Sequence, residues 1–346
     1  MFKFFKDWYN THLTEPNQAS FALIILFTII ILYVLVETVA PILVAVVLAY
    51  MLEGLVQRSL DYTDLERKFV VLLVYSFFII ISVIIIFLLL PLMLDQLSVL
   101  LTSLPAYINK GKTMALGIFS SEQMNNFLGG LNEEMSSMGK DVLSYSLHSA
   151  GSIFETVIYI FIVPILIFFI LYDKENIFNW FKKFFPEKLD LSKKASKELD
   201  LKIGNYIRCK FIEIIIVWAS SFIVFFALDL KYSLLLSFLC GISVIIPYVG
   251  AIAVTIPIIL VGYFQWGATA DFWYVIIGHA LIQIVDGNVV VPILFSDAVN
   301  IHPIAILIAI LFFGSIWGVW GVFFAIPLAV FLNTLINIWP TTKVEV

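Results

Sequence analysis

The chain has 346 residues, of which 62% are hydrophobic and 13% are charged, and its mean hydropathy is +1.04. No water-soluble domain has a core large enough to bury that much apolar surface, so the composition excludes the soluble classes and predicts a polytopic membrane protein. The net charge of -5 adds little, and the two cysteines give neither a disulfide framework nor a metal-binding spacing.

Apolar runs of spanning length follow one another along the chain. The continuous ones are Phe21–Val36, Pro41–Val56, Phe69–Leu94, Ile153–Leu171, Phe211–Leu228 and Phe272–Leu294. Two further runs, Ser233–Phe264 and Pro303–Ile338, are too long for one span, and glycine or proline interrupts each near its middle. The expected fold class is therefore an all-α polytopic membrane protein with about six full spans and two broken or re-entrant helical hairpins.

Basic residues on the loops predict the orientation of the chain. Residues 173–210 carry ten of the twenty Lys and Arg residues, so we expect this loop to be cytoplasmic. The short loop Asp61–Lys68 is also basic, in agreement after two intervening spans. Both termini are then expected in the cytoplasm.

These features divide the chain into consecutive parts. Residues 95–152 show apolar positions at helical spacing mixed with Ser, Asn and Gly, which predicts external amphipathic helices on the membrane or packed over the transport core. A module that binds partners is the alternative for this segment. The other parts are three amino-terminal spans (1–94), a span with the basic loop (153–210), a transport core (211–338) with hairpins at 233–264 and 303–338, and a cytoplasmic tail (339–346).

The two broken runs resemble each other. A shift of 71 residues places Gly250 on Gly321 and Pro247 on Gly318, and each run follows a span and a short polar turn. Paired interruptions of this kind predict an inverted repeat with a binding site where the hairpins meet, whereas chance similarity between glycine-rich segments is the alternative. The candidate breaks are Pro247, Gly250 and Pro257 in the first hairpin and Gly314, Gly318, Gly321 and Pro327 in the second.

Several motifs in order point to a family. They are "FILYDKE", "GNYIRCK", "IPYVGAIAVTIP", "QIVDGNVVVPILFSDAVNIHP" and "GSIWGVWGVFFAIPLAV", which cover roughly residues 153–335. Together they resemble the autoinducer-2 exporter family of bacterial membrane proteins. The resemblance implies export of a small polar signal or exchange of Na⁺ or Li⁺ for protons. One departure is Asp286, where relatives usually carry Glu before "GN".

Ionisable and amide side chains inside spans are candidates for binding, because a charge in the bilayer is costly. Gln283 and Asp286 share a helix face, Asn288 follows, and Gly287 and Pro292 loosen the helix around them. This oxygen-rich set suits a small cation, a proton or a polyhydroxylated solute. An interhelical hydrogen-bond staple is the alternative reading.

Three further ionisable residues join the candidate binding set. His279 lies one turn before Gln283, and histidine is the residue type whose unperturbed pKa is closest to neutrality, although a histidine in a span more often only bonds a neighbour. Arg208 and Glu213 enter the span before the first hairpin, where Arg208 caps the cytoplasmic end, extends to the head groups or pairs with the carboxylate before "GN".

Aromatic residues at the breaks are candidates to line a path. They are Tyr248, Trp317 and Trp320, for which core or interfacial packing is the competing interpretation.

No catalytic motif, nucleotide-binding loop or metal spacing is present in the sequence, so we expect no enzyme, no cofactor, no metal and no nucleic-acid partner. The expected partners are the bilayer, a small polar solute with H⁺ or Na⁺, and further copies of the chain. The sequence therefore predicts a secondary transporter working by alternating access. A Na⁺(Li⁺)/H⁺ antiporter, a channel and a non-transporting assembly protein are the alternatives.

Overall fold

The computed structural model describes residues 36–115, 158–182, 190–247, 249–295 and 302–338, and within these ranges every regular element is a helix. Five helices there are long and apolar enough to cross a membrane: Ala40–Tyr62, Arg67–Ser103, Asp200–Ala227, Val249–Trp266 and Ala270–Phe295. The chain is thus an all-α, multi-pass membrane protein, as its composition predicts. The predicted span Phe21–Val36 and most of segment 95–152 lie outside the described residues.

The chain divides into two compact units, each assembled from separate stretches of sequence. The first comprises residues 1–75, 162–212 and 289–346, and the second comprises residues 76–161 and 213–288. The first hairpin falls in the second unit, and the second hairpin falls in the first unit. Each unit therefore combines early and late parts of the chain around one broken run.

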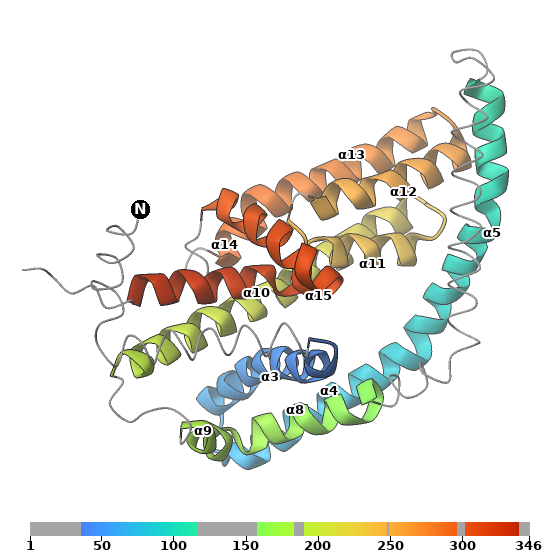
Figure 1. The fold of residues 1–346 in the computed structure, drawn as a ribbon. Coiled ribbons are helices and arrows are strands. Elements are labelled where there is room, and N and C mark those ends of the chain that lie inside the picture. The colour runs from blue at the N-terminus through green and yellow to red at the C-terminus, as the bar shows by residue number, and fades with distance from the viewer. Residues whose placement is uncertain (1–35, 116–157, 183–189, 248, 296–301, 339–346) are drawn as a thin grey trace, which may run out of the picture. The chain divides into compact units, whose positions relative to one another are not determined.

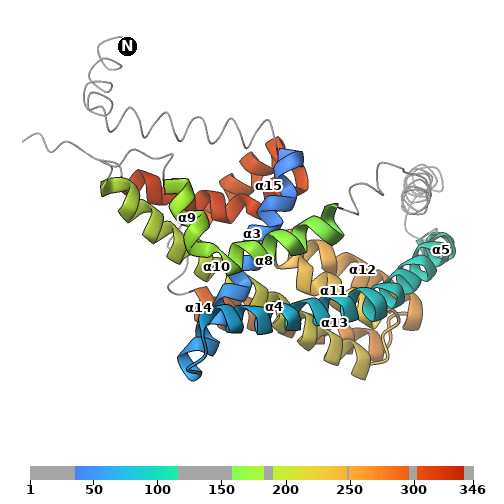
Figure 2. The same cartoon turned by 90° about the horizontal axis from the view of Figure 1, so that it is seen from below.

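In the first unit, helix α3 (Val36–Tyr62) packs across α8 (Val163–Tyr172), which leads into α9 (Lys174–Lys182) (Figure 1). The view from below shows the same crossing of α3 and α8 (Figure 2). A buried cluster joins α3, the first part of α10 (Asp190–Ala227) and α15 (Pro303–Ile338). Its members are Val47, Tyr206, Ile207, Phe324, Ile326 and Val330.

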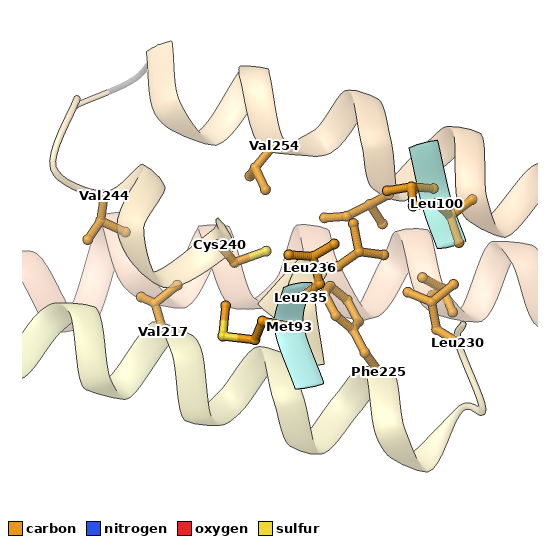
Figure 3. Close-up of a cluster of buried hydrophobic side chains, with 13 residues drawn as sticks. Met93, Leu100, Val217, Phe225, Leu230, Leu235, Leu236, Cys240, Val244 and Val254 are labelled. Carbon is orange, nitrogen blue, oxygen red and sulfur yellow. The ribbon is translucent and has the colours of Figure 1, made fainter. Parts of the chain in front are cut away.

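In the second unit, α11 (Ser233–Ser243), α12 (Val249–Trp266) and α13 (Ala270–Val285) pack in succession (Figure 1). Their apolar core also takes Val217 and Phe225 from α10 and Met93 and Leu100 from α5 (Leu90–Ala115), as Figure 3 shows. The beginning of the predicted external segment is therefore a helix that packs on the hairpin.

Polar side chains fix the turn at which the first hairpin begins. Gln265 of α12 donates from Nε2 to the Asp229 carbonyl oxygen at 2.7 Å, and its Oε1 accepts from the Lys231 amide at 2.8 Å. Gln96 of α5 accepts from the Leu235 amide at 3.0 Å, which satisfies a donor in the first turn of α11. The turn between α10 and α11 is therefore held by both α12 and α5.

Among the described helices, three contain a π-turn, and a proline follows the end of each turn by two residues. The turns are η1 (Ile85–Leu89) before Pro91, η2 (Ile158–Ile162) before Pro164, and η3 (Asp286–Val290) before Pro292. Proline lacks an amide proton and its ring crowds the carbonyl four residues earlier, so the wider π-turn relieves the clash. The helix α4 (Arg67–Ile84) continues through η1 into α5, and α13 continues through η3 into α14 (Val291–Phe295).

Candidate transport site

The first broken run forms two helices joined by residues 244–248, where the chain leaves the helical path at and around Pro247. Gly250, the second residue of the return helix, has its backbone against the Ser243 carbonyl oxygen, so that a β-carbon at position 250 would overlap this oxygen. Only glycine fits such a close approach of two backbones. The chain therefore leaves the helix where the sequence predicts a break, and Gly250 permits the close approach of the two helices.

The second broken run changes direction at Gly318, whose φ of 57° and ψ of −132° are outside the helical region and suit only glycine. Figure 1 shows α15 as two limbs, one folded back on the other. Gly321 lies with its backbone against the Phe313 carbonyl oxygen, as Gly250 does with Ser243. The predicted pairing of Pro247 with Gly318 and of Gly250 with Gly321 thus has a counterpart in local geometry.

Three of the predicted break residues do not interrupt their helices. Pro257 lies inside α12, and Gly314 and Pro327 lie inside the helical limbs of α15. A single missing amide is tolerated in a membrane helix when neighbouring groups satisfy the freed carbonyl, so these prolines do not end their helices. Gly314 instead permits close packing, because a β-carbon there would come within 2.8 Å of Val322 Cγ2.

The polar residues at the end of α13 and the start of η3 occupy one face of the continuous helix. His279 and Asp286 are 3% and 8% exposed, and Gln283 between them is partly buried. The neighbouring Leu281 and Ile284 are more than half exposed, so the apolar side of the helix faces outward. Asp286 is also the first residue of the π-turn η3, where an irregular turn often marks a functional position. The structure therefore brings together three predicted binding residues.

The hydrogen bonds of His279 determine which ring nitrogen carries its proton. Thr255 donates its hydroxyl proton to the Ala251 carbonyl oxygen at 2.7 Å, and its Oγ1 lies 3.0 Å from His279 Nε2. Because that hydroxyl has given its only proton away, Nε2 must be the donor to it. The lone pair of Nδ1 then faces the thiol of Cys240, with 4.0 Å between Nδ1 and Sγ.

Glu213 belongs to the same unit, on α10, and is 2% exposed. Asn288 has a different position, because its side chain is exposed and its Nδ2 donates to the Ile284 carbonyl oxygen of its own helix at 2.9 Å. Among the described residues, no group of three or more His, Cys, Asp and Glu side chains is placed to hold a metal ion. The described residues of this unit therefore include two buried carboxyl groups, Glu213 and Asp286, whereas Asn288 is exposed.

Comparisons with known proteins show the family of this chain. The model of the family described as "AI-2E family transporter" matches residues 22–341. The chain belongs to the AI-2E transporter family. It is 35% identical over 351 residues to "Putative permease PerM" of Escherichia coli K12, covering 99% of both chains. It is 26% identical over 310 residues to "Putative transport protein YueF" of Bacillus subtilis, covering 85% of this chain and 83% of that one.

One AI-2E motif, "GNYIRCK", packs against the end of α14 in the first unit. Cys209 donates from Sγ to the Leu294 carbonyl oxygen at 2.9 Å, and Lys210 lies over the ring of Phe295 at 5.1 Å. Arg208 donates to Asn205 Oδ1 at 2.6 Å and its aliphatic stem lies against Gly54 of α3. The motif therefore joins α10 to both α3 and α14, and Arg208 packs within the first unit.

A second AI-2E motif, "FILYDKE", takes part in an ion-pair network around Glu53 that the sequence did not reveal. Arg67 donates to both carboxylate oxygens of Glu53, at 2.8 and 3.1 Å, and also to the Leu171 carbonyl oxygen at 3.3 Å. Lys174 lies 3.4 Å from the same carboxylate. The buried side chain of Glu53 connects α3, α4 and α9.

The aromatic candidates have packing roles in the described part of the AI-2E chain. Trp317 stacks on Phe313 with ring centroids 5.6 Å apart, and Trp320 stacks on Phe324 at 6.3 Å. The indole nitrogen of Trp317 is buried with no hydrogen-bond partner among the described residues, so it keeps a donor available at the bend. Tyr248 lies outside the described residues.

Proposed function

We propose that this AI-2E family member is a secondary active transporter of the bacterial inner membrane. It exports a small polar solute of the autoinducer-2 kind through alternating access, and a proton or sodium gradient drives the export. Family membership supports transport, and the buried acids of the second unit support coupling to a cation. Both termini lie on the cytoplasmic side in this proposal, and the assembled transporter contains further copies of the chain.

The observation that carries the proposal is the burial of Asp286 and Glu213. Burial disfavours the charged form of a carboxyl group, so such a group favours the uptake of a proton or a small cation. Release of the proton or cation on the other side of the membrane then requires that the site open to water there. This cycle is the coupling that secondary transport needs.

The two hairpins supply the irregular backbone at which a solute can be bound. Helix α11 has 11 residues, about 16 Å at 1.5 Å per residue, whereas the hydrocarbon core is about 30 Å thick. The limbs Ile304–Gly318 and Trp320–Thr334 are also shorter than a full span. Short limbs that turn back are typical of re-entrant segments, whose exposed amides and carbonyls line binding sites in transporters.

A Na⁺(Li⁺)/H⁺ antiporter is the second candidate, because the same buried carboxyls suit direct exchange of cations without a solute. If the protein were a channel or a non-transporting assembly protein, we would expect no gradient-coupled flux. Purified protein in liposomes distinguishes these cases when uptake of a labelled furanone or polyol is measured with and without an imposed pH or Na⁺ gradient. Cation flux without solute would favour the antiporter.

The decisive variant is Asp286→Asn, which keeps the shape of the side chain and removes its charge. We expect coupled flux to fall to the level of empty liposomes while the protein stays folded. The matched control is Asp271→Asn, in the first turn of the same helix, where the carboxylate is exposed. Unchanged flux in Asp286→Asn, or an equal loss in both variants, would remove Asp286 from the mechanism.

A further inference from the structure

The second unit contains a group of soft donor atoms that the transport proposal does not use. Cys240 is fully buried on α11, His279 is 3% exposed on α13, and Met93 on α5 is 8% exposed. Cys240 and Met93 belong to the same buried apolar cluster, and Figure 3 shows both of their sulfur atoms inside it. Thiolate, imidazole and thioether are the ligand types that select Cu(I) and related ions.

The geometry of the Cys240–His279 pair fits a metal ion between the two donors. Their atoms Sγ and Nδ1 are 4.0 Å apart. Metal–sulfur and metal–nitrogen bonds are each about 2 Å long, so an ion placed between the two atoms in a nearly linear arrangement spans about 4 Å. The pair is therefore separated by the length of two coordination bonds.

The proton positions also favour metal binding. Thr255 accepts the proton of His279 Nε2, so the imidazole is held in the tautomer whose Nδ1 lone pair points toward the thiol. In metal sites, the second ring nitrogen of a ligating histidine is oriented in the same way by an oxygen acceptor. Thr255 thus supplies the supporting contact that a metal-binding histidine requires.

The charge balance selects the kind of ion. One thiolate, one neutral imidazole and one monovalent cation sum to zero, which suits a site surrounded by residues such as Phe225, Leu236 and Val275. A divalent ion would leave a positive charge in the apolar cluster. We propose that Cys240 and His279 bind one soft monovalent cation, Cu(I) or Ag(I), and that Met93, which belongs to the same buried cluster as Cys240, supplies a thioether donor.

Binding is a proton exchange without any redox change. The S–H bond of Cys240 breaks and an S–metal bond forms, one proton passes to the buffer, and His279 donates its Nδ1 lone pair while keeping the proton on Nε2. The oxidation state of the ion is unchanged. The site needs no gradient and no solute, so its test is independent of the transport proposal.

The experiment uses the full chain in detergent, with Ag⁺ as a redox-inert probe in chloride-free buffer. We expect one Ag⁺ per chain after gel filtration, measured by elemental analysis, and one proton released per ion bound. Cys240→Ser and His279→Gln should each weaken binding at least tenfold, and Met93→Leu should weaken it less. Cys209→Ala is the matched control, because it removes the other cysteine of the chain and should bind as wild type does.

Two results would overturn the proposal. One is retention of wild-type affinity in Cys240→Ser, and the other is loss of binding in Cys209→Ala. X-ray absorption of the loaded wild-type protein gives a check that needs no variant. We expect one nitrogen and at least one sulfur around the ion, so a spectrum without nitrogen would exclude His279 as a ligand.

Discussion

Gly250 and Ser243 are in contact through their backbones, so closely that the Ser243 carbonyl oxygen occupies the place of a β-carbon at position 250. Gly321 has the same relation to Phe313 at the second bend. Each hairpin is therefore closed by a glycine on the return limb that lies against a carbonyl on the outgoing limb. The two bends use the same packing device although one contains a proline and the other a glycine with positive φ.

Gly250→Ala and Gly321→Ala should each destabilise the protein. The added methyl group overlaps backbone, which has no rotamer to change, so we expect a loss of at least about 1–3 kcal/mol in the free energy of unfolding. Thermal denaturation in detergent measures the effect. Gly287→Ala is the control, because nothing lies within 4 Å of the added carbon. Equal stability of Gly250→Ala and Gly287→Ala would show that the backbones at the first bend are not in such close contact.

Arg67→Met should destabilise the first unit by leaving the Glu53 carboxylate buried with fewer donors. We expect a loss of about 1–3 kcal/mol in the free energy of unfolding, since an acceptor that loses its partner keeps its desolvation cost. Lys174→Met should cost less, because that contact is 3.4 Å long and the lysine side chain is 45% exposed.

A double variant tests whether the loss of stability comes from breaking the ion pair or from removing either side chain alone. Glu53→Met combined with Arg67→Met removes both charges, so it should be more stable than Arg67→Met alone. Arg58→Met serves as a surface control, because Arg58 is exposed near the end of the same helix as Glu53. A double variant no more stable than the Arg67→Met protein would mean that the ion pair is not the source of the loss.

Pro292→Ala should convert the π-turn η3 into regular helix. With the amide restored and the ring removed, the helix can continue with ordinary bonds, so thermal stability should not fall. Coupled flux should fall, because Asp286 would turn relative to α14. The comparison is Pro91→Ala, which alters a π-turn of five apolar residues and should leave flux near the wild-type level. Wild-type flux in Pro292→Ala would show that transport does not depend on the π-turn.

Gln265→Leu should loosen the turn between α10 and α11. It removes one hydrogen bond to Asp229 and one from Lys231, and we expect a cost of about 1–2 kcal/mol in the free energy of unfolding because the site is partly solvated.

Asp229→Gly at the same turn should instead increase the free energy of unfolding. Asp229 has a φ of 51°, which glycine adopts without strain, so a gain of a few tenths of a kcal/mol (roughly) is expected. Denaturation of both variants in the same detergent tests the contrast in sign.

The sequence predicted the fold class and the two bends well, because glycine and proline inside an apolar run leave a direct signal. It also predicted a loosened helix around Gly287 and Pro292, which is the π-turn η3. It misread Pro257 as a break, since proline weakens a helix without always ending it.

Contacts between distant residues were beyond the reach of one sequence. Lys174 and Glu53 are 121 residues apart, and Cys240 and His279 are 39 apart, so no local pattern connects either pair. The sequence around Glu53 does not indicate its ion-pair partners, because these lie on two other helices. The candidate residues on α13 were accessible to sequence reasoning because they share one helix face.

The π-turn η3 changes the phase of its helix. A π-turn holds an additional residue compared with the α-helical path, and each residue turns an α-helix by about 100°. The side chains of α14 are therefore directed about 100° away from where an unbroken continuation of α13 would place them. Asn288 and Val289, inside this turn, are also where the chain passes from the second unit to the first. One inserted residue thus lets a single membrane helix present separate faces to two different packing environments.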